Sequence, residues 1–287
     1  MKYALSAISA GFLAALLAAP PAFSQGGERP GAPAATTSSL EVAYDLYAGG
    51  ISFGHAVMSA RVEGGDYKAI STLETKGIVN AFWQSKIETS SSGKLTPGKL
   101  QPVVYDSFSQ NKSTPRREVV LTFGPDGPKS IVSNPPYPDD KYPVSGELRK
   151  NTLDPLSASL FLVTNLASTG AKDCSGVAPI FDGRRRYDVG ISFVKNSAIR
   201  MDNGLYAGPA QVCQVRYRQI AGYSQEVIEK NKKFPDIFAW VVAFKGTADP
   251  GRAYMVPVRI WAQTDYGIIA AVVSQLKLDG APFGGTR

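Results

Sequence analysis

The chain is poor in the residues that bind transition metals. Its 287 residues include one histidine, His55, and two cysteines, Cys174 and Cys213. Zinc and other transition-metal centres gather several His or Cys ligands. The two cysteines lie too far apart for a CxxC redox motif and do not fit a zinc-site pattern. We therefore expect neither a metal nor a cofactor.

Long apolar runs are also scarce, and the one at the N-terminus predicts export. Lys2 precedes the run from Ala4 to Ala19, and Ala22-Phe23-Ser24 offers a small-x-small cleavage pattern. The run is shorter than the ~20 apolar residues that a membrane span needs. This favours a cleavable signal peptide over residues 1–24 rather than a retained anchor. We expect a periplasmic protein with no transmembrane segment after cleavage and, because no cysteine follows the cleavage point, no lipid attachment there.

The exported chain is expected to be basic. Loss of Lys2 lowers the 31 basic side chains to 30, against 24 acidic ones, which leaves a net charge of +6. Export argues against nucleic acid as a partner, and weak attraction to an anionic membrane surface or envelope polymer fits better. Residues 25–39, rich in Gly, Pro and Ser, predict a flexible leader. Residues 40–287 are then expected to form a single β-rich periplasmic domain.

An even number of cysteines in an oxidising compartment predicts a disulfide. We expect Cys174 and Cys213 to be bonded, with a structural role. The alternative is two separate buried thiols, which is favoured only if the chain is not exported. On the chain-entropy estimate, closing a loop of about 40 residues stabilises the fold by roughly 4 kcal/mol.

Alternation of apolar and polar residues dominates the sequence and predicts an antiparallel β-domain. Turn signals fall between successive segments, for example Gly49-Gly50 and Gly64-Gly65-Asp66. The predicted strands are 40–48, 51–62, 67–75, 83–91, 103–110, 116–123, 185–193, 210–220, 237–244, 254–263 and 267–278.

Two segments interrupt this alternation. Asp154-Pro155 is a strong helix start, and the apolar stripe that follows predicts one helix ending near Gly170, packed across the sheet or inside a curled one. Residues 133–146 hold four prolines, which cannot lie in a central strand. We expect a long loop there, and it is the best candidate for a domain boundary.

Several local patterns, taken in order, resemble an uncharacterised family of exported proteobacterial proteins, a DUF3108-like domain of unknown function. The matching pieces are Tyr44-Asp45-Leu46-Tyr47 with Gly50 and Gly54, Asp154-Pro155-Leu156-Ser157, Phe181-Asp182-Gly183-Arg184-Arg185-Arg186-Tyr187-Asp188, Cys213 with Gly222-Tyr223, and Pro257-Val258-Arg259-Ile260 with Tyr266-Gly267. The resemblance implies a mainly β fold, a curled antiparallel sheet or open barrel like those of lipoprotein carriers. It brings no catalytic residues.

The densest charge cluster lies between Asp182 and Asp188. Arginine can hold a carboxylate or phosphate in a bidentate fork, so Arg184 and Arg186 are candidate anion-binding residues, with Arg259 beside Trp261 as a third. On a strand, Arg184 and Arg186 would share a face with the two aspartates. The competing interpretation is a network in which the arginines pair with their aspartate neighbours.

Three tryptophans are candidates for lining an apolar cavity: Trp83, Trp240 and Trp261. Aromatic residues in strands also serve simply as core. Gly50-Ile51-Ser52-Phe53-Gly54 matches the G-x-S-x-G pattern of hydrolases, but the alternation that follows it predicts a hairpin rather than the required turn and helix.

The leading interpretation is a noncatalytic periplasmic protein that binds an envelope component, either a lipid-like ligand or an envelope protein. One alternative is an enzyme acting on envelope glycan or lipid through two carboxyl groups about 5 to 9 Å apart. The other is a structural scaffold with a filled interior and an exposed apolar patch.

Overall fold

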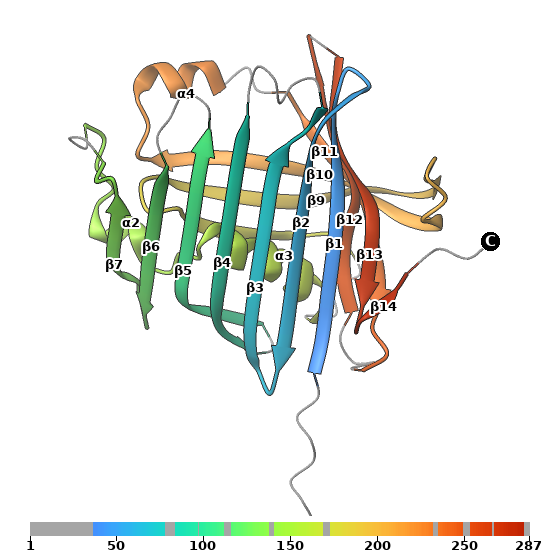
Figure 1. Ribbon diagram of the computed structural model, residues 1–287, viewed down its shortest axis with the longest axis horizontal. Coiled ribbons are helices and arrows are strands. Elements are labelled where there is room, and N and C mark those ends of the chain that lie inside the picture. The colour runs from blue at the N-terminus through green and yellow to red at the C-terminus, as the bar shows by residue number, and fades with distance from the viewer. Residues whose placement is uncertain are drawn as a thin grey trace, which may run out of the picture. The chain divides into compact units, whose positions relative to one another are not determined.

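In the part of the chain that the structure describes, fourteen strands form one sheet in the computed structural model (Figure 1). The described residues are 37–77, 84–96, 98–111, 116–137, 141–168, 173–231, 235–248, 253–265 and 267–283, and all belong to one compact unit, Ala35–Arg287. The strands are β1 Thr37–Ala48, β2 Ile51–Glu63, β3 Asp66–Thr75, β4 Ser85–Thr96, β5 Lys99–Asn111, β6 Arg117–Gly124, β7 Gly127–Asn134, β8 Gly176–Phe181, β9 Arg186–Arg200, β10 Ala207–Ala221, β11 Ile237–Lys245, β12 Ala253–Thr264, β13 Gly267–Leu278 and β14 Ala281–Pro282.

The sheet is antiparallel throughout and its two ends are not paired with each other. Its order is β7-β6-β5-β4-β3-β2-β1-β13-β12-β11-β10-β9-β8, and β14 pairs with β13. The first and last long strands, β1 and β13, therefore lie side by side in its middle. Figure 1 shows β1 to β7 as one layer and β9 to β11 crossing behind it at a steep angle. The predicted fold class, a mainly β curled antiparallel sheet, is confirmed.

Hairpin turns set the strand register where the sequence predicted them. Gly49 and Gly50 join β1 to β2 with φ of +56° and +83°. A two-residue turn of this kind requires positive φ at both positions, which glycine adopts without strain. β2 continues through Ser52 and Gly54 to His55, so the G-x-S-x-G segment is part of a hairpin and not a nucleophile elbow.

Three expectations about element boundaries were wrong. β7 and β8 were not predicted as strands because each contains a proline, Pro128 in β7 and Pro179 in β8. They form nevertheless because both lie at an end of the sheet, where a residue without an N–H group is tolerated. The expected leader 25–39 extends too far, because Thr37–Ser39 belong to β1; Ser38 is buried and accepts a hydrogen bond from Tyr254 at 3.2 Å. The Pro-rich segment is not all loop, since β7 ends at Asn134 and a short helix starts at Gly146.

One longer helix, α3 (Pro155–Ser168), packs inside the curl and contacts β3, β4, β5, β8 and β12. Asp154 caps it as predicted, accepting from the backbone N–H groups of Leu156 and Ser157. Leu156 and Leu160 enter the main core with residues of β2 to β6 and β8. The described chain also contains the short helices α2 (Gly146–Arg149) and α4 (Gln225–Asn231).

The segment between α2 and α3 spans the gap between the two ends of the sheet. Asn151 donates its N–H to the carbonyl of Asp126 in the β6–β7 turn, at 2.8 Å. Leu153 exchanges backbone hydrogen bonds with Pro179 and Phe181 of β8. We call residues 149–153 the strap. Because β7 and β8 are not paired directly, the strap is the backbone link between them.

The predicted disulfide is present. Cys174 and Cys213 are bonded, with 6.3 Å between their Cα atoms, and both residues are fully buried. The bond joins the segment before β8 to β10 and packs against Ala239, Val241 and Met255. Among the described helices, none is both long and apolar enough to cross a membrane.

Candidate ligand-binding site

An apolar cavity of about 290 Å³ lies beside α3, inside the curled sheet. Leu162 and Val163 of the helix form one wall, and residues of β1, β2 and β9 to β12 form the others. Side chains that line these walls include Val42, Tyr44, Met58, Ile191, Val215 and Met255. The helix therefore fills only part of the interior, and the space left is bounded by hydrocarbon.

The few polar groups of this cavity are neutral. The Tyr44 hydroxyl donates to the carbonyl oxygen of Pro257 at 3.0 Å, and burial raises the pKa of this phenol, so it stays protonated at any physiological pH. Ser159 of α3 also lines the cavity and is solvent-exposed, which places an opening beside it. None of the described residues that line the cavity carries a charge.

The tryptophans predicted to line an apolar cavity do not line this one. Trp240 lies on β11 between Ala239 and Val241, which face the cavity. Neighbouring residues of a strand point to opposite faces, so Trp240 faces the other side of the sheet, where it contacts Trp261 with 5.5 Å between ring centroids. Trp83 lies outside the described residues. Alternation could show which residues point inward, but not whether they fill the space.

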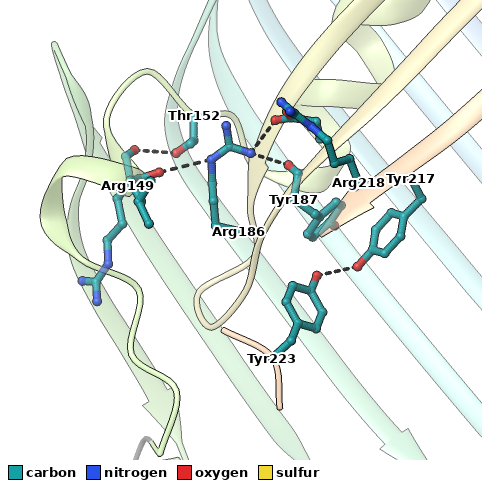
Figure 2. Close-up of polar contacts among 9 residues, drawn as sticks. Arg149, Thr152, Arg186, Tyr187, Tyr217, Arg218 and Tyr223 are labelled. Carbon is teal, nitrogen blue, oxygen red and sulfur yellow. Dashed lines mark hydrogen bonds and ion pairs between the residues drawn. The ribbon is translucent and has the colours of Figure 1, made fainter. Parts of the chain in front are cut away.

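Arg186 belongs to a network of contacts with its own neighbours. Its guanidinium donates to Asp188 at 2.5 Å and to the carbonyl oxygens of Tyr187 and Leu148 at 2.6 and 3.1 Å. Arg218, opposite Asp188 on β10, donates to the other carboxylate oxygen. Figure 2 shows Arg186, at the start of β9, between Arg149 and Thr152 of the strap on one side and Tyr187 and Arg218 on the other. These contacts correspond to the self-paired interpretation of this arginine.

Arg184 lies in the β8–β9 turn and not on a strand, so it shares no strand face with Arg186. Asp182 accepts from the backbone N–H groups of Arg184 and Arg185 and fixes this turn. The Arg184 guanidinium lies 5.1 Å from the ring centre of Tyr137, which also holds a second arginine, Arg117, at 4.5 Å. The side chain of Arg184 is exposed.

Two tyrosines complete this region. Tyr217 and Tyr223 share a hydrogen bond between their hydroxyl groups at 2.5 Å (Figure 2), and Arg185 lies over the Tyr223 ring. Burial raises the pKa of both phenols. The region is rich in arginine and aromatic rings, but its polar groups largely satisfy one another.

Among the described residues, no hydrogen bond or ion pair holds the Arg259 side chain, and its Nε is buried. It lies on β12, with its guanidinium 5.1 Å from the ring centre of Trp240 and 5.6 Å from that of Trp261. The structure thus brings together Arg259, Trp240 and Trp261, three of the predicted site residues, on the face of the sheet opposite the interior cavity. Among the described residues, no group of three or more His, Cys, Asp or Glu side chains is placed to hold a metal ion.

Comparison with known protein families identifies a relationship over most of the chain. A family model described as protein of unknown function (DUF3108) matches residues 43–274. The chain belongs to this family. No curated protein matches it. The match begins within β1 and ends within β13, so the DUF3108 domain includes the curled sheet, α3 and the disulfide.

A solved structure extends the comparison to the fold. A beta-barrel-like protein of the domain of unknown function DUF1849 from Brucella abortus superposes with a TM-score of 0.51 over 84% of this chain and 97% of that chain. The two sequences are 9% identical. At this identity the likeness shows a shared architecture only, and the DUF3108 chain must be interpreted from its own residues.

Proposed function

We propose that this protein is a noncatalytic binding protein of the cell envelope, which takes the hydrocarbon part of a lipid-like ligand into the cavity beside α3. The observation that carries the proposal is that this cavity has an apolar, uncharged lining and an opening at Ser159. Among the described residues of the lining, the only hydroxyl groups are those of Ser159 and Tyr44, and burial keeps the Tyr44 phenol protonated by raising its pKa, which disfavours acid–base chemistry there. Burial of hydrocarbon provides the affinity.

The size of the cavity sets the kind of ligand. An engineered cavity of about 150 Å³ holds one benzene molecule, and ligand pockets generally start at about 300 Å³. The 290 Å³ beside α3 therefore suits a single alkyl chain of moderate length rather than a whole lipid. The polar head would remain at the opening, next to the exposed Ser159.

Export to the periplasm is part of the proposal. The predicted signal peptide and the buried Cys174–Cys213 disulfide support it, since disulfides persist in oxidising compartments. A carrier or sensor of envelope lipids would meet its ligand there.

A chain-length series tests this function. Saturated alkyl carboxylates of six to sixteen carbons would be titrated into disulfide-intact, delipidated protein by calorimetry. Each buried CH₂ contributes about 0.8 kcal/mol, so affinity should rise about fifteenfold for every two carbons until the cavity is full and then level off. Native mass spectrometry of the protein purified from the periplasm would identify a co-purified ligand.

A matched pair of variants places the ligand in the cavity. Val215 lines it, whereas Val194 of β9 is exposed. Val215→Phe should fill the space and lower affinity for the best chain at least tenfold, and Val194→Phe should not change it. Equal affinities in the two folded variants, or no uptake of any chain, would contradict the proposal. The latter result would favour the scaffold alternative, for which the exposed Ile51, Ile268 and Ile269 supply an apolar surface.

A further inference from the structure

A second cavity, of about 580 Å³, lies on the opposite face of the sheet. It is bounded by the tip of the β9–β10 hairpin, residues 200–203, and by strands β1, β11, β12 and β13. On β1, Asp45 and Tyr47 face this cavity, whereas Val42 and Tyr44 face the interior one. The two cavities are therefore separated by the sheet, and we call this one the outer cavity.

The hairpin tip is held over the outer cavity by Asn203. Its side-chain amide donates to the carbonyl of Val273 on β13 at 2.7 Å, and its side-chain oxygen accepts from the N–H of Leu205. The tip is thus fixed directly to β13, at a residue 70 positions away in sequence. The outer cavity is a formed feature of the fold and not a gap beneath an unattached loop.

Arg259 lines the outer cavity and lacks a hydrogen-bond partner there. Its Nε–H is buried and donates to no acceptor among the described residues, while the guanidinium lies over the rings of Trp240 and Trp261. A buried donor without an acceptor destabilises the folded state. The indole rings restrict the movement of the guanidinium. Its N–H donors form a planar fork that matches the two oxygens of a carboxylate.

The remaining walls are of two kinds. Trp240, Tyr47 and Val272 offer aromatic and apolar surface. Arg200, Asp202 and Ser274 offer polar groups, and neither Arg200 nor Asp202 has an ion-pair partner among the described residues. Asp45 is engaged by His55, with 3.0 Å between the carboxylate oxygen and Nδ1. An alkyl chain would leave the buried Nε–H of Arg259 unpaired, and a lone inorganic anion would occupy a small part of the volume.

We propose that the outer cavity binds an acidic saccharide. Arg259 receives the carboxylate, and the Trp240 ring packs against the apolar face of the sugar ring. The Asp202 carboxylate accepts hydrogen bonds from sugar hydroxyl groups, as does the Ser274 oxygen, whose own hydrogen is donated to the carbonyl of Ala43. This ligand class uses each kind of group in the lining. The proposal is separate from the lipid-like ligand of the interior cavity and requires no chemistry at the sugar.

Two sugars that differ by one carboxylate-bearing lactyl group test the proposal. N-acetylmuramic acid carries a lactyl carboxylate that N-acetylglucosamine lacks, and both would be titrated while indole N–H signals are followed by NMR. We expect the acid to bind at least tenfold more tightly and to shift the indole signals. Equal binding of the two sugars would contradict the proposal, as would lactate competing at the same concentration as the acid sugar, which would indicate a site for a free anion.

Variants assign the carboxylate to Arg259. Arg259→Gln should lower affinity for N-acetylmuramic acid about ten- to a hundredfold and make it equal to that for N-acetylglucosamine. Arg259→Lys keeps the positive charge but lacks the planar fork, so it should retain part of the preference for N-acetylmuramic acid over N-acetylglucosamine. It replaces Arg259→Gln in this test if the glutamine variant does not fold. Arg216→Gln, an exposed arginine on β10 outside the outer cavity, is the control. An unchanged preference in folded Arg259→Gln would overturn the assignment.

The two cavities can be tested independently. Arg259→Gln should leave alkyl carboxylate binding unchanged, and Val215→Phe should leave saccharide binding unchanged. If Val215→Phe abolished both, the outer cavity would not be a separate site.

Discussion

At the scale of single residues, two buried carboxyl groups have pKa values shifted in opposite directions. Asp154 is fully buried and accepts from Ser157 and Ser91, whose hydroxyls also contact Tyr67. Burial raises the pKa of Asp154, although these hydrogen bonds oppose the shift. A buried Asp–Ser–Tyr cluster resembles a catalytic set, but its carboxylate caps α3 and no described cavity reaches it. We therefore assign it a structural role.

Asp188 provides a pH prediction. Burial opposes its ionisation, but hydrogen bonds from Arg218 and Arg186 outweigh this and hold its pKa below the usual range. A carboxyl group with a depressed pKa stabilises the fold above its unfolded pKa of ~3.9 and loses that contribution as the pH falls through the folded value. Asp188→Asn should lower the free energy of unfolding by about 1–3 kcal/mol at pH 7, and the difference from wild type should shrink at pH 3.

Urea unfolding at the two pH values measures this difference. Asp66→Asn is the control, since the Asp66–Lys94 pair is exposed and such pairs contribute little. A difference between Asp188→Asn and wild type that stays the same at pH 7 and pH 3 would show that the ion pairs do not stabilise the fold through the charge of Asp188.

At the scale of elements, the turn between β8 and β9 packs against β6, at the opposite end of the sheet. Gly183 has φ of +97°, and a Cβ there would lie 2.6 Å from Cγ1 of Val119. Gly183→Ala therefore adds backbone strain and a clash, and should lower the free energy of unfolding by about 2–4 kcal/mol. The urea midpoint measures it.

A second glycine separates the two causes. Gly204, in the β9–β10 hairpin, has φ of +73° with nothing within 4 Å of its Cβ position. Gly204→Ala should cost only the backbone strain, about 1–2 kcal/mol. Equal losses in the two variants would mean that the contact between the β8–β9 turn and β6 does not contribute to holding the ends of the sheet together.

Most elements could be predicted from sequence because their determinants are local. Alternation and paired glycines located β1 to β3, and Asp154-Pro155 located α3. β7 and β8 were not predicted because each contains a proline. A strand tolerates proline when it lies at an end of the sheet, and the position of a strand in the sheet is a property of the assembled fold. The Ser91 contact of Asp154 joins residues 63 positions apart and has no local signal.

At the scale of the whole molecule, the candidate sites were predictable only in part. Arg259 could be proposed because it is a basic residue close to Trp261 on one strand, and Trp240 because it is a large aromatic residue of another strand. The interior cavity could not, since it depends on how far α3 fills the space that the sheet encloses. Of the partners of Arg186, Asp188 was foreseen in the competing interpretation, whereas the carbonyl of Leu148 in α2 lies 38 residues away and has no local signal.

The disulfide links these scales, because one covalent bond joins the segment leading to the end strand β8 with β10. Replacing both cysteines by serine frees a loop of 39 residues in the unfolded chain, and should lower the free energy of unfolding by roughly 4 kcal/mol. Chemical reduction of the wild type should have an effect of similar size, since it removes the same bond. Urea unfolding under oxidising and reducing conditions measures both. Because Cys174 and Cys213 pack beside Val215 and Ile191 of the interior cavity, alkyl carboxylate binding should weaken in the serine variant even where it is folded. A serine variant as stable as the oxidised wild type would show that the buried contacts around β8 and β10 hold these strands without the bond.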